Sequence, residues 1–198
     1  MSQEKNVLKA VAREIGSKGR ARSVRRDGLI PAVAYGHGVN DLVISVDPKE
    51  LERVLRTDYA YNAVFDLAVE GGDTHQVMVR ELQFDSVKRV VTHVDFKVVR
   101  DSDTVVVHIP VVTEGRSTGV AQGGRLDIVQ RAVKVRTTVS SIPIDVTHDV
   151  TELGIGEQVY IDEMTAPEGS EFVFNNRFPV IRVARRRGAK AAAAGSDE

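Results

Sequence analysis

The sequence contains no cysteine and no tryptophan, and only 5% of its 198 residues are aromatic. The absence of cysteine excludes disulfides, thiolate metal sites and a cysteine nucleophile, and it agrees with a reducing compartment. No apolar run approaches the ~20 residues that a membrane-spanning helix needs. The first residues, MSQEKNVLKA, lack the apolar core of a signal peptide. We therefore expect a soluble, cytoplasmic protein with no membrane partner.

The net charge of −1 hides an uneven distribution along the chain. Residues 13–26 carry six basic groups and one acid, whereas residues 101–184 carry 7 Lys and Arg against 12 Asp and Glu. A binding partner responds to the local charge more than to the total. The basic segment is therefore a candidate anion-binding region, although the overall charge does not suggest one.

The first hundred residues show a pattern of short strands with two helices. Apolar alternation and turn residues predict strands over 8–15, 29–35, 42–46, 63–69, 75–83 and 90–99. The clearest helix is DPKELERVLR, where Asp47 can cap the N-terminus, Pro48 suits the first turn and Leu51 starts the apolar face. A shorter helix is expected over 17–27 and is closed by Gly28, the residue type usual just past a helix end.

The second half is predicted to be a β-rich domain that follows the polar break at 101–103. Strands are expected over 105–112, 132–138, 144–146, 158–161, 172–174 and 180–183, in a sandwich or barrel-like arrangement. The glycine-rich stretch 119–125 predicts a turn, because it lacks the spacing of a phosphate-binding loop. The expected fold is therefore mainly β, with domains at 1–100 and 101–184 and a flexible basic, alanine-rich tail at 185–198.

Four basic residues of the helix expected over 17–27 form one stripe. Lys18, Arg22, Arg25 and Arg26 are spaced i, i+4, i+7 and i+8, so their side chains project within one arc of about 80–100°. No acidic residue lies four positions from them on the helix. Such a stripe suits a phosphate backbone, and a solvated helix face is the alternative that the charges alone leave open.

A second candidate site lies in the strand expected over 90–99. Side chains alternate along a strand, so Val91, His93 and Asp95 share one face and Phe96 points to the other. The pair suits readout of RNA base edges or sugar hydroxyls, or it is a local His–Asp pair on a wet sheet face. Catalysis by this pair would need a nucleophile, a metal or a cofactor loop, and we find no motif for any of them. The five histidines are not spaced as zinc ligands.

Tyr35 ends the strand expected over 29–35, directly after the basic helix. It is either a tyrosine at the edge of the core with a wet hydroxyl, or a residue that stacks on a base or sugar or hydrogen-bonds the RNA backbone. The sequence alone does not separate these roles.

Taken in order, these motifs resemble the bacterial large-subunit ribosomal protein twenty-five family, which binds 5S rRNA and includes the general stress protein Ctc. The similar segments are Arg13 to Gly36, VDPKEL at 46–51, VRELQ at 79–83 and HVDF at 93–96. The second half resembles the C-terminal domain of the longer members at 109–115, 119–127 and 142–164. The resemblance covers about residues 6–184.

This resemblance implies an N-terminal β-barrel with short helices that binds the loop E region of 5S rRNA in the central protuberance of the large ribosomal subunit. It implies a structural constituent of the ribosome that is not an enzyme and has no small-molecule substrate. No cofactor is implied, and magnesium ions at the RNA interface are left open. The RNA contacts would come from Arg13, Lys18, Arg20, Arg22, Arg25, Arg26, Tyr35, Gln83, Lys88, Arg89, His93 and Asp95.

One position departs from the family pattern. Phe84-Asp85 stands where members often carry His-Pro, so a contact from that loop is open, and Lys88 and Arg89 are candidates to replace it. The acidic second domain is expected to dock to 23S rRNA or to neighbouring large-subunit proteins. The alternative function is a stress-related interaction protein that acts off the ribosome.

Overall fold

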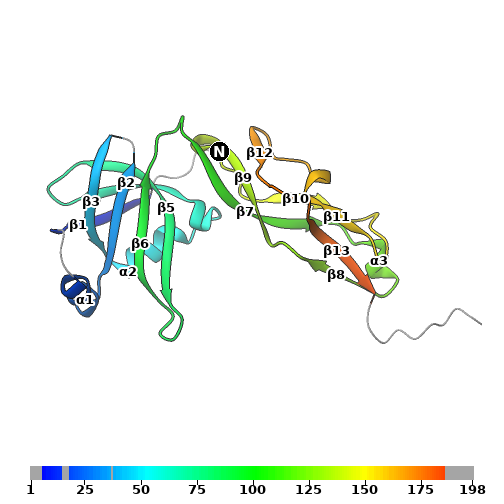
Figure 1. The fold of residues 1–198 in the computed structure, drawn as a ribbon, viewed down its shortest axis with the longest axis horizontal. Coiled ribbons are helices and arrows are strands. Elements are labelled where there is room, and N and C mark those ends of the chain that lie inside the picture. Colours follow the sequence, from blue (N-terminus) through cyan, green and yellow to red (C-terminus); the bar gives the residue numbers. More distant parts are fainter. Residues whose placement is uncertain (1–5, 15–17, 37, 186–198) are drawn as a thin grey trace, which may run out of the picture. The chain divides into compact units, whose positions relative to one another are not determined.

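The computed structural model describes residues 6–14, 18–36 and 38–185 and divides the chain into two compact units, 1–103 and 104–198 (Figure 1). Each unit is described below by itself. In the part of the chain that the structure describes, no helix is long and apolar enough to cross a membrane.

The first unit is a closed six-stranded barrel with two short helices. Its strands follow the order β1-β3-β2-β6-β5-β4 around the barrel. The barrel closes through β1, which pairs antiparallel with β3 and parallel with β4. The elements are β1 Val7–Ala12, α1 Lys18–Arg26, β2 Ile30–Gly36, β3 Val39–Val46, α2 Pro48–Leu55, the 3₁₀ turn η1 Ala60–Asn62, β4 Val64–Val69, β5 Thr74–Asp85 and β6 Val90–Val98.

Alternation of side chains along these strands fills the barrel with apolar groups. Ala32 and Ala34 of β2 and Val94 and Phe96 of β6 are fully buried. The ring of Phe65 packs edge-to-face on Phe96, with the ring centroids 5.8 Å apart. The expected mainly-β barrel is therefore confirmed, with each predicted strand of this half present and its ends shifted by a few residues.

Helix α2 covers one end of the barrel. The carboxylate of Asp47 accepts hydrogen bonds from the backbone N–H groups of Lys49 and Glu50, which satisfies donors that the first turn leaves unpaired. The helix buries Leu51 and Val54 against the barrel core. The cap, the proline in the first turn and the buried face are as the sequence predicts.

The second unit consists of two sheets, a four-stranded one in the order β10-β7-β9-β12 and a three-stranded one in the order β11-β13-β8. This confirms a β-rich second half. Its elements are β7 Thr104–Glu114, α3 Thr118–Ala121, β8 Gly124–Ile128, β9 Ala132–Thr138, the 3₁₀ turn η2 Val139–Ser141, β10 Val146–Asp149, β11 Gln158–Tyr160, the 3₁₀ turn η3 Ile161–Glu163, β12 Ser170–Phe172 and β13 Pro179–Arg185.

The structure corrects several expectations for this unit. The stretch 119–125 is no simple turn, because it contains most of α3 and the start of β8. Its glycines allow close packing: a Cβ on Gly119 would lie 2.8 Å from the backbone of Gly154, and one on Gly124 would lie 2.7 Å from the Gly119 carbonyl oxygen. The strand expected at 144–146 begins only at Val146. Arg185, assigned to the tail, pairs with Gly124 as the last residue of β13, and residues 186–198 lie outside the described residues.

A substitution at Gly36 would test how closely β2 must pack against β6. Its φ of +147° is one that side chains rarely adopt, and a Cβ there would lie 2.5 Å from the carbonyl oxygen of Val98. We expect Gly36→Ala to lower the stability of the barrel by about 3 kcal/mol, measured by native-state hydrogen exchange of β2 and β6 amides. The matched control is Gly71→Ala, which shares a positive φ but has open space around it and should cost only about 1–2 kcal/mol. Equal losses in the two variants would contradict the packing argument.

Candidate nucleic-acid interface

Helix α1 ends in a hydrogen-bonded glycine cap. Gly28, at φ +82°, donates to the carbonyl of Arg25, and Leu29 donates to that of Val24. These two bonds form a Schellman motif, which satisfies carbonyls that the helix end leaves free. The motif closes the helix two residues before β2 begins, so the basic helix is attached directly to the barrel wall.

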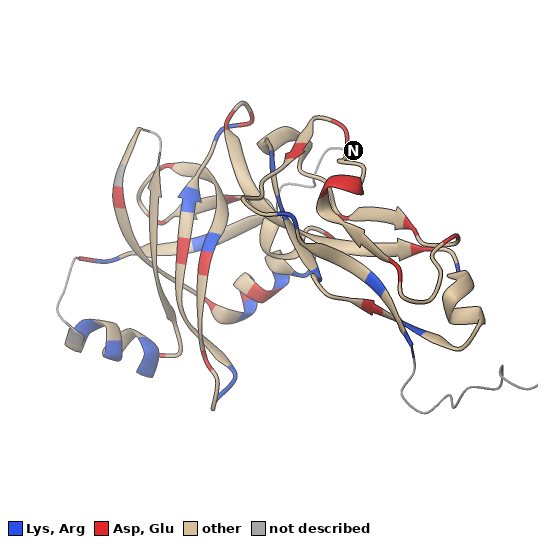
Figure 2. Ribbon diagram, turned by 45° about the vertical axis from the view of Figure 1, so that its right-hand side comes forward, with Lys and Arg blue, Asp and Glu red and all other residues tan. Residues whose placement is uncertain are grey.

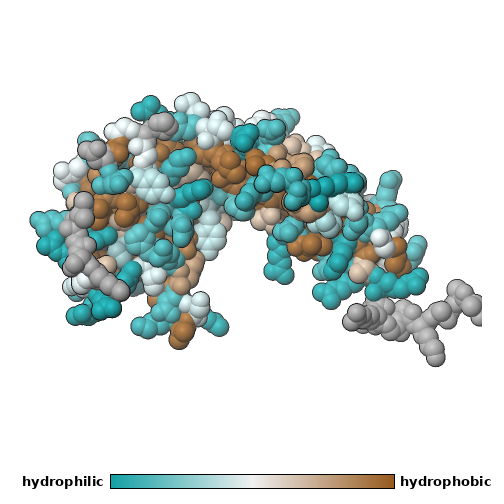
Figure 3. All heavy atoms as spheres, in the orientation of Figure 1, coloured by the Kyte–Doolittle hydropathy of each residue, from teal (hydrophilic) through white to brown (hydrophobic). Residues whose placement is uncertain are grey.

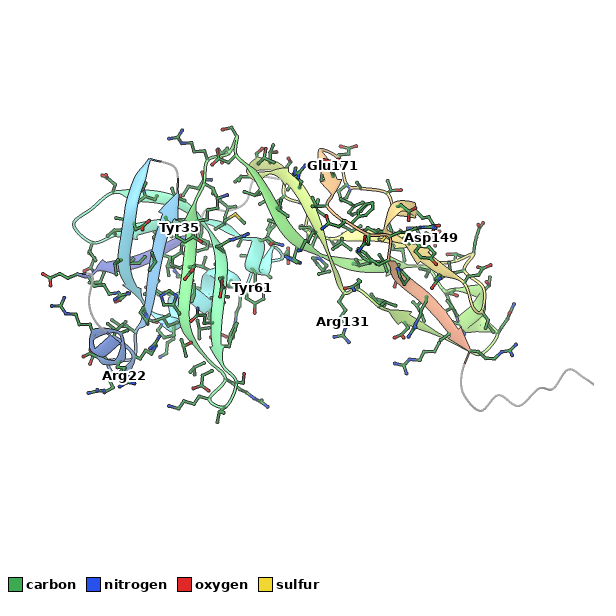
Figure 4. The ribbon with its side chains drawn as sticks, viewed as in Figure 1. Arg22, Tyr35, Tyr61, Arg131, Asp149 and Glu171 are labelled. Carbon is green, nitrogen blue, oxygen red and sulfur yellow. The ribbon has the colours of Figure 1, made fainter. Side chains whose placement is uncertain are left out.

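The described part of the basic stripe is exposed to solvent. Arg22, Arg25 and Arg26 are exposed, whereas Ala21 and Val24 on the opposite side of α1 are half-buried. Figure 2 shows Lys and Arg gathered along this helix, and Figure 4 shows Arg22 extending outward from it. The side chain of Lys18, the first member of the predicted stripe, lies outside the described residues.

Backbone carbonyls hold two arginines in place. The Nε of Arg25 donates to the carbonyl oxygen of Thr92 on β6 at 2.9 Å, and the Nε of Arg13 donates to that of Ile44 on β3 at 3.0 Å. Burial, together with the nearby charge of Arg25, lowers the pKa of Arg13. Neither guanidinium has a carboxylate partner among the described residues. The arrangement fixes two neighbouring positive charges whose free N–H groups suit an anion such as phosphate.

The other arginines of this segment differ in how they are engaged. Arg20 pairs with Glu14 at 2.8 Å, and both side chains are exposed. Exposed pairs of this kind contribute little to stability. Within the described ranges, Arg22 and Arg26 make no ion pair. The charge of Arg20 is thus partly neutralised, while Arg22 and Arg26 keep their charge.

The residues predicted on the sheet lie on three adjacent strands. His93 and Asp95 stand on the outer face of β6, since Val94 and Phe96 point into the core. His93 is in register with Gln83 of β5, and Tyr35 of β2 is in register with Lys97 of β6. The strand order β2-β6-β5 therefore brings Tyr35, His93, Asp95 and Gln83 onto one outer face of the barrel, where Figure 4 labels Tyr35.

His93 and Asp95 are close neighbours on this face. Nδ1 of His93 lies 2.7 Å from Oδ1 of Asp95, with the two side chains 22% and 29% exposed. The two atoms are not aligned as a hydrogen bond, and this buried nitrogen has no aligned partner among the described residues. The contact becomes an ion pair when His93 is protonated. It holds the carboxylate at the surface as an acceptor for donor groups of a ligand.

A β-bulge interrupts the strict alternation expected for β6. The register passes from Gln83 opposite His93 to Phe84 opposite Val91, so Thr92 has no partner on β5. Val91 consequently packs against the barrel core instead of sharing the face of His93. The expectation that Val91 lies on that face is therefore wrong beyond the bulge, although it holds for Asp95.

The turn between β5 and β6 is tightly ordered. The carboxylate of Asp85 accepts from the N–H groups of Val87 and Lys88, and the N–H of Arg89 donates to the Asp85 carbonyl. Arg89 adopts a positive φ of +54° to make this turn. The turn projects Lys88 and Arg89 at the same end of the barrel as α1 (Figure 2). Asp85, the departure from the family pattern, thus builds the turn that presents both basic residues.

Ion pairs engage several charged residues of the second unit. Arg177 donates to Asp162 at 2.9 Å and to Glu163 at 2.6 Å, and its guanidinium lies 3.8 Å from the ring centre of Tyr160. The hydrogen bond from Arg182 lowers the pKa of Asp127. In the described ranges, no group of three or more His, Cys, Asp or Glu is arranged to hold a metal.

Sequence reasoning missed one feature of the first unit, a groove with a volume of about 830 Å³ at the end of the barrel where α1 and the β5–β6 turn lie. Its lining includes Tyr61 and Phe84, and it does not include His93 or Asp95. The sequence hinted at it only through the departure from the family pattern at 84–85, which places a phenylalanine beside the turn.

Comparison with known proteins assigns both units. Residues 8–96 match the model of the Ribosomal L25p family, and residues 104–187 match that of the ribosomal protein TL5 C-terminal domain. Proteins named large ribosomal subunit protein bL25 are similar over most of the chain. The one from Anaeromyxobacter dehalogenans strain 2CP-C is 40% identical, over 90% of this chain and 74% of its own length. That of Rhodospirillum rubrum is 34% identical, over 96% and 92% of the two chains.

These matches define the class of the chain as a ribosomal protein. The protein belongs to the Ribosomal L25p family, in the two-part form that carries a TL5 C-terminal domain. The resemblance found in the sequence is thereby confirmed.

Asp85 gives a pH-dependent test of the ordered turn. Backbone hydrogen bonds from Lys88 and Val87, and then the charge of Lys88, lower the pKa of Asp85. A carboxylate whose pKa is lower in the folded chain stabilises the fold above its unfolded pKa, and the effect is lost as the pH falls through the folded pKa. We expect the amide protection of Val87 and Lys88 to fall in step with protonation of Asp85, measured by NMR.

The control is Asp85→Asn, which keeps an oxygen acceptor but does not titrate. It should retain the turn and remove the pH dependence, whereas Asp85→Ala should lose amide protection at all pH values. Protection that is the same in all three proteins would show that the side chain does not order the turn.

Proposed function

We propose that this ribosomal protein is a non-catalytic structural constituent of the large subunit that binds 5S rRNA at its loop E region, in the central protuberance. The observation that carries the proposal is the pair formed by Arg13 and Arg25, fixed by backbone carbonyls at the barrel wall and free of described carboxylates. If these two arginines had only a structural role, an acidic partner would be expected beside them. A rigid pair of uncompensated guanidiniums instead suits phosphates.

The arginines and the residues of the outer face would have different roles in binding. The arginines of α1 and Arg13 would contact phosphates and fix the position of the protein on the RNA, which is a sequence-independent contribution. The outer face with Tyr35, His93 and Asp95 offers a stacking surface and an acceptor. A carboxylate is repelled by phosphate but accepts from base amino groups, so Asp95 would contribute to specificity.

The family name and the relatives' names support the ribosomal part of this proposal, and the 5S rRNA partner follows from the family resemblance and the cationic pair. The second unit would dock to 23S rRNA or neighbouring large-subunit proteins, since its arginines Arg177 and Arg182 are already paired with acids. We expect the protein to act in the cytoplasm on the ribosome.

The phosphate contacts are tested with Arg25→Ala in a salt titration of 5S rRNA binding by the full-length protein. We expect affinity to fall about tenfold, because a charge-assisted hydrogen bond is lost. The slope of log affinity against log salt should flatten by about 1 for each phosphate contact removed. The control is Arg53→Ala on the exposed side of α2, which should leave both quantities unchanged. An unaltered slope in Arg25→Ala would remove Arg25 from the interface.

The specificity role is tested with Asp95→Ala, using 5S rRNA and an otherwise identical RNA whose loop E is replaced by a regular duplex. The variant should lose about tenfold in the affinity ratio of the two RNAs while its salt slope stays at the wild-type value. Asp66→Ala, a half-buried aspartate on β4, serves as the matched control. An unchanged ratio in Asp95→Ala would exclude specific readout by this carboxylate. Failure of the wild-type protein to prefer the loop E RNA would contradict the proposed function itself.

A further inference from the structure

The groove at the end of the barrel lies entirely within the first unit. It is bounded by α2, by η1, by the segment after α1 and by the part of the β5–β6 hairpin that runs beyond the bulge at Thr92. At about 830 Å³ it falls within the volume range of ~300–1,000 Å³ in which proteins bind small ligands and side-chain clusters. Tyr35, His93 and Asp95 do not line it, whereas Arg25, Lys88 and Arg89 do.

The groove is apolar inside and has exposed apolar walls. Leu29, Leu51 and Leu55 form part of its lining on one side, and Leu82 and Val91 on the other. Three further lining side chains are large and exposed, with relative exposures of 57% for Tyr61, 53% for Phe84 and 50% for Val90. Apolar surface gathered around one hollow indicates a binding site, whereas scattered apolar residues do not. Figure 3 shows one face of this hairpin end, where apolar atoms reach the surface among hydrophilic ones.

Several hydrogen-bond acceptors around the groove already have a partner. Glu52 accepts from Arg56 at 2.7 Å. Asp85 accepts from the backbone of its own turn, and the Thr92 carbonyl accepts from Arg25. What remains at the rim is positive charge, since Arg89 has no ion pair within the described residues. The groove therefore offers apolar contact within a positively charged rim.

This chemistry separates two kinds of occupant. A nucleobase would bring amino and ring N–H donors into a groove whose lining is mainly apolar, and a buried donor without a partner is costly. Apolar side chains of a protein segment would fill the interior without bringing polar side-chain groups into it. Acidic residues flanking those side chains would meet the rim cations.

We propose that this groove docks a short segment of a partner protein, consisting of apolar side chains flanked by Asp or Glu. The site does not include His93 or Asp95, but it adjoins the proposed phosphate contacts, because Arg25, Lys88 and Arg89 also line the groove. A partner bound there would contact the hairpin and α2 while the outer face of β6 stays free.

Site-directed photo-crosslinking tests the proposal in the full-length protein. Tyr61 is replaced by p-benzoylphenylalanine, a benzophenone amino acid of similar shape, and the large subunits are irradiated after purification from the protein's own cells. We expect a cross-link to one protein, whose cross-linked peptide, sequenced by mass spectrometry, contains apolar residues flanked by carboxylates. The control position is Val11 on β1, which is 45% exposed and does not line the groove; it should not give that product.

Second-site variants make the test specific to the groove. Phe84→Ala, which removes an apolar wall, and Arg56→Glu, which makes the rim acidic, should each lower the cross-link yield at least about fivefold, a loss of about 1 kcal/mol. Phe174→Ala, which alters an exposed phenylalanine of the second unit, should leave the yield unchanged. Amide exchange of the barrel core verifies that each variant remains folded.

Three results would overturn the proposal. The first is a cross-link to RNA in place of protein, which would make the groove a nucleotide site. The second is a protein product that is insensitive to both Phe84→Ala and Arg56→Glu, or whose cross-linked segment is basic. The third is no cross-link above that of the Val11 position. Retention of 5S rRNA binding by Phe84→Ala is expected in addition, and its loss would overturn the proposal by showing that the apolar wall of the groove contacts RNA.

Discussion

The hydrogen bond from Arg25 to the Thr92 carbonyl joins the basic helix α1 to strand β6, and the proposed interface depends on both. Thr92 is the extra residue of a β-bulge, so its carbonyl is available to a side chain instead of a partner strand. The bulge leaves His93 and Asp95 on the outer face and turns Val91 toward the core. This irregularity thus provides the carbonyl that anchors the basic helix to the barrel wall, while the ordinary alternation of β6 places His93 and Asp95 on the outer face.

Closure of the barrel makes this arrangement rigid. Because β1 pairs with both β3 and β4, the barrel has no open edge, and each strand is held on two sides. In the strand order β1-β3-β2, the chain must cross β3 between β1 and β2, and α1 lies in that crossing. Arg13 follows β1 and binds β3 through its backbone and its side chain. Both ends of the crossing are therefore fixed to the barrel, which limits how far the stripe can move.

Much of this fold follows from local patterns in the sequence. Period-two alternation predicts the strands of the first unit, and the Asp47-Pro48 pair predicts the start of α2, because each depends only on neighbouring residues. Alternation also places His93 and Asp95 together. It fails at Val91, because a bulge shifts the register without a local signature. The reading of glycines as turn residues fails at Gly124. This glycine begins β8, and its lack of a side chain allows a close approach to Gly119 of the adjoining helix.

The neighbourhood of Arg13 and Arg25 could not be predicted in the same way. It depends on β1 and β3 lying side by side and on a carbonyl freed by the bulge, and both are properties of the folded chain. The groove escaped prediction for a similar reason. Leu82 and Val91 have the pattern of core residues and pack against the barrel core, and only the structure shows that they also line the groove at the end of the barrel.

Arg13 and Arg25 repel each other in the free protein. Burial and the charge of Arg25 both disfavour the charged guanidinium in the free protein, yet Arg13 remains charged near neutral pH because an arginine titrates far above it. An anion between the two arginines would remove the repulsion and replace the lost solvation by charge-assisted hydrogen bonds. Under the proposed function, a phosphate bound between the two arginines would therefore relieve an unfavourable electrostatic energy that a neutral ligand would leave in place. Carbonyl oxygens can hold such a pair where carboxylates could not, because they fix the geometry of the guanidiniums without cancelling their charge.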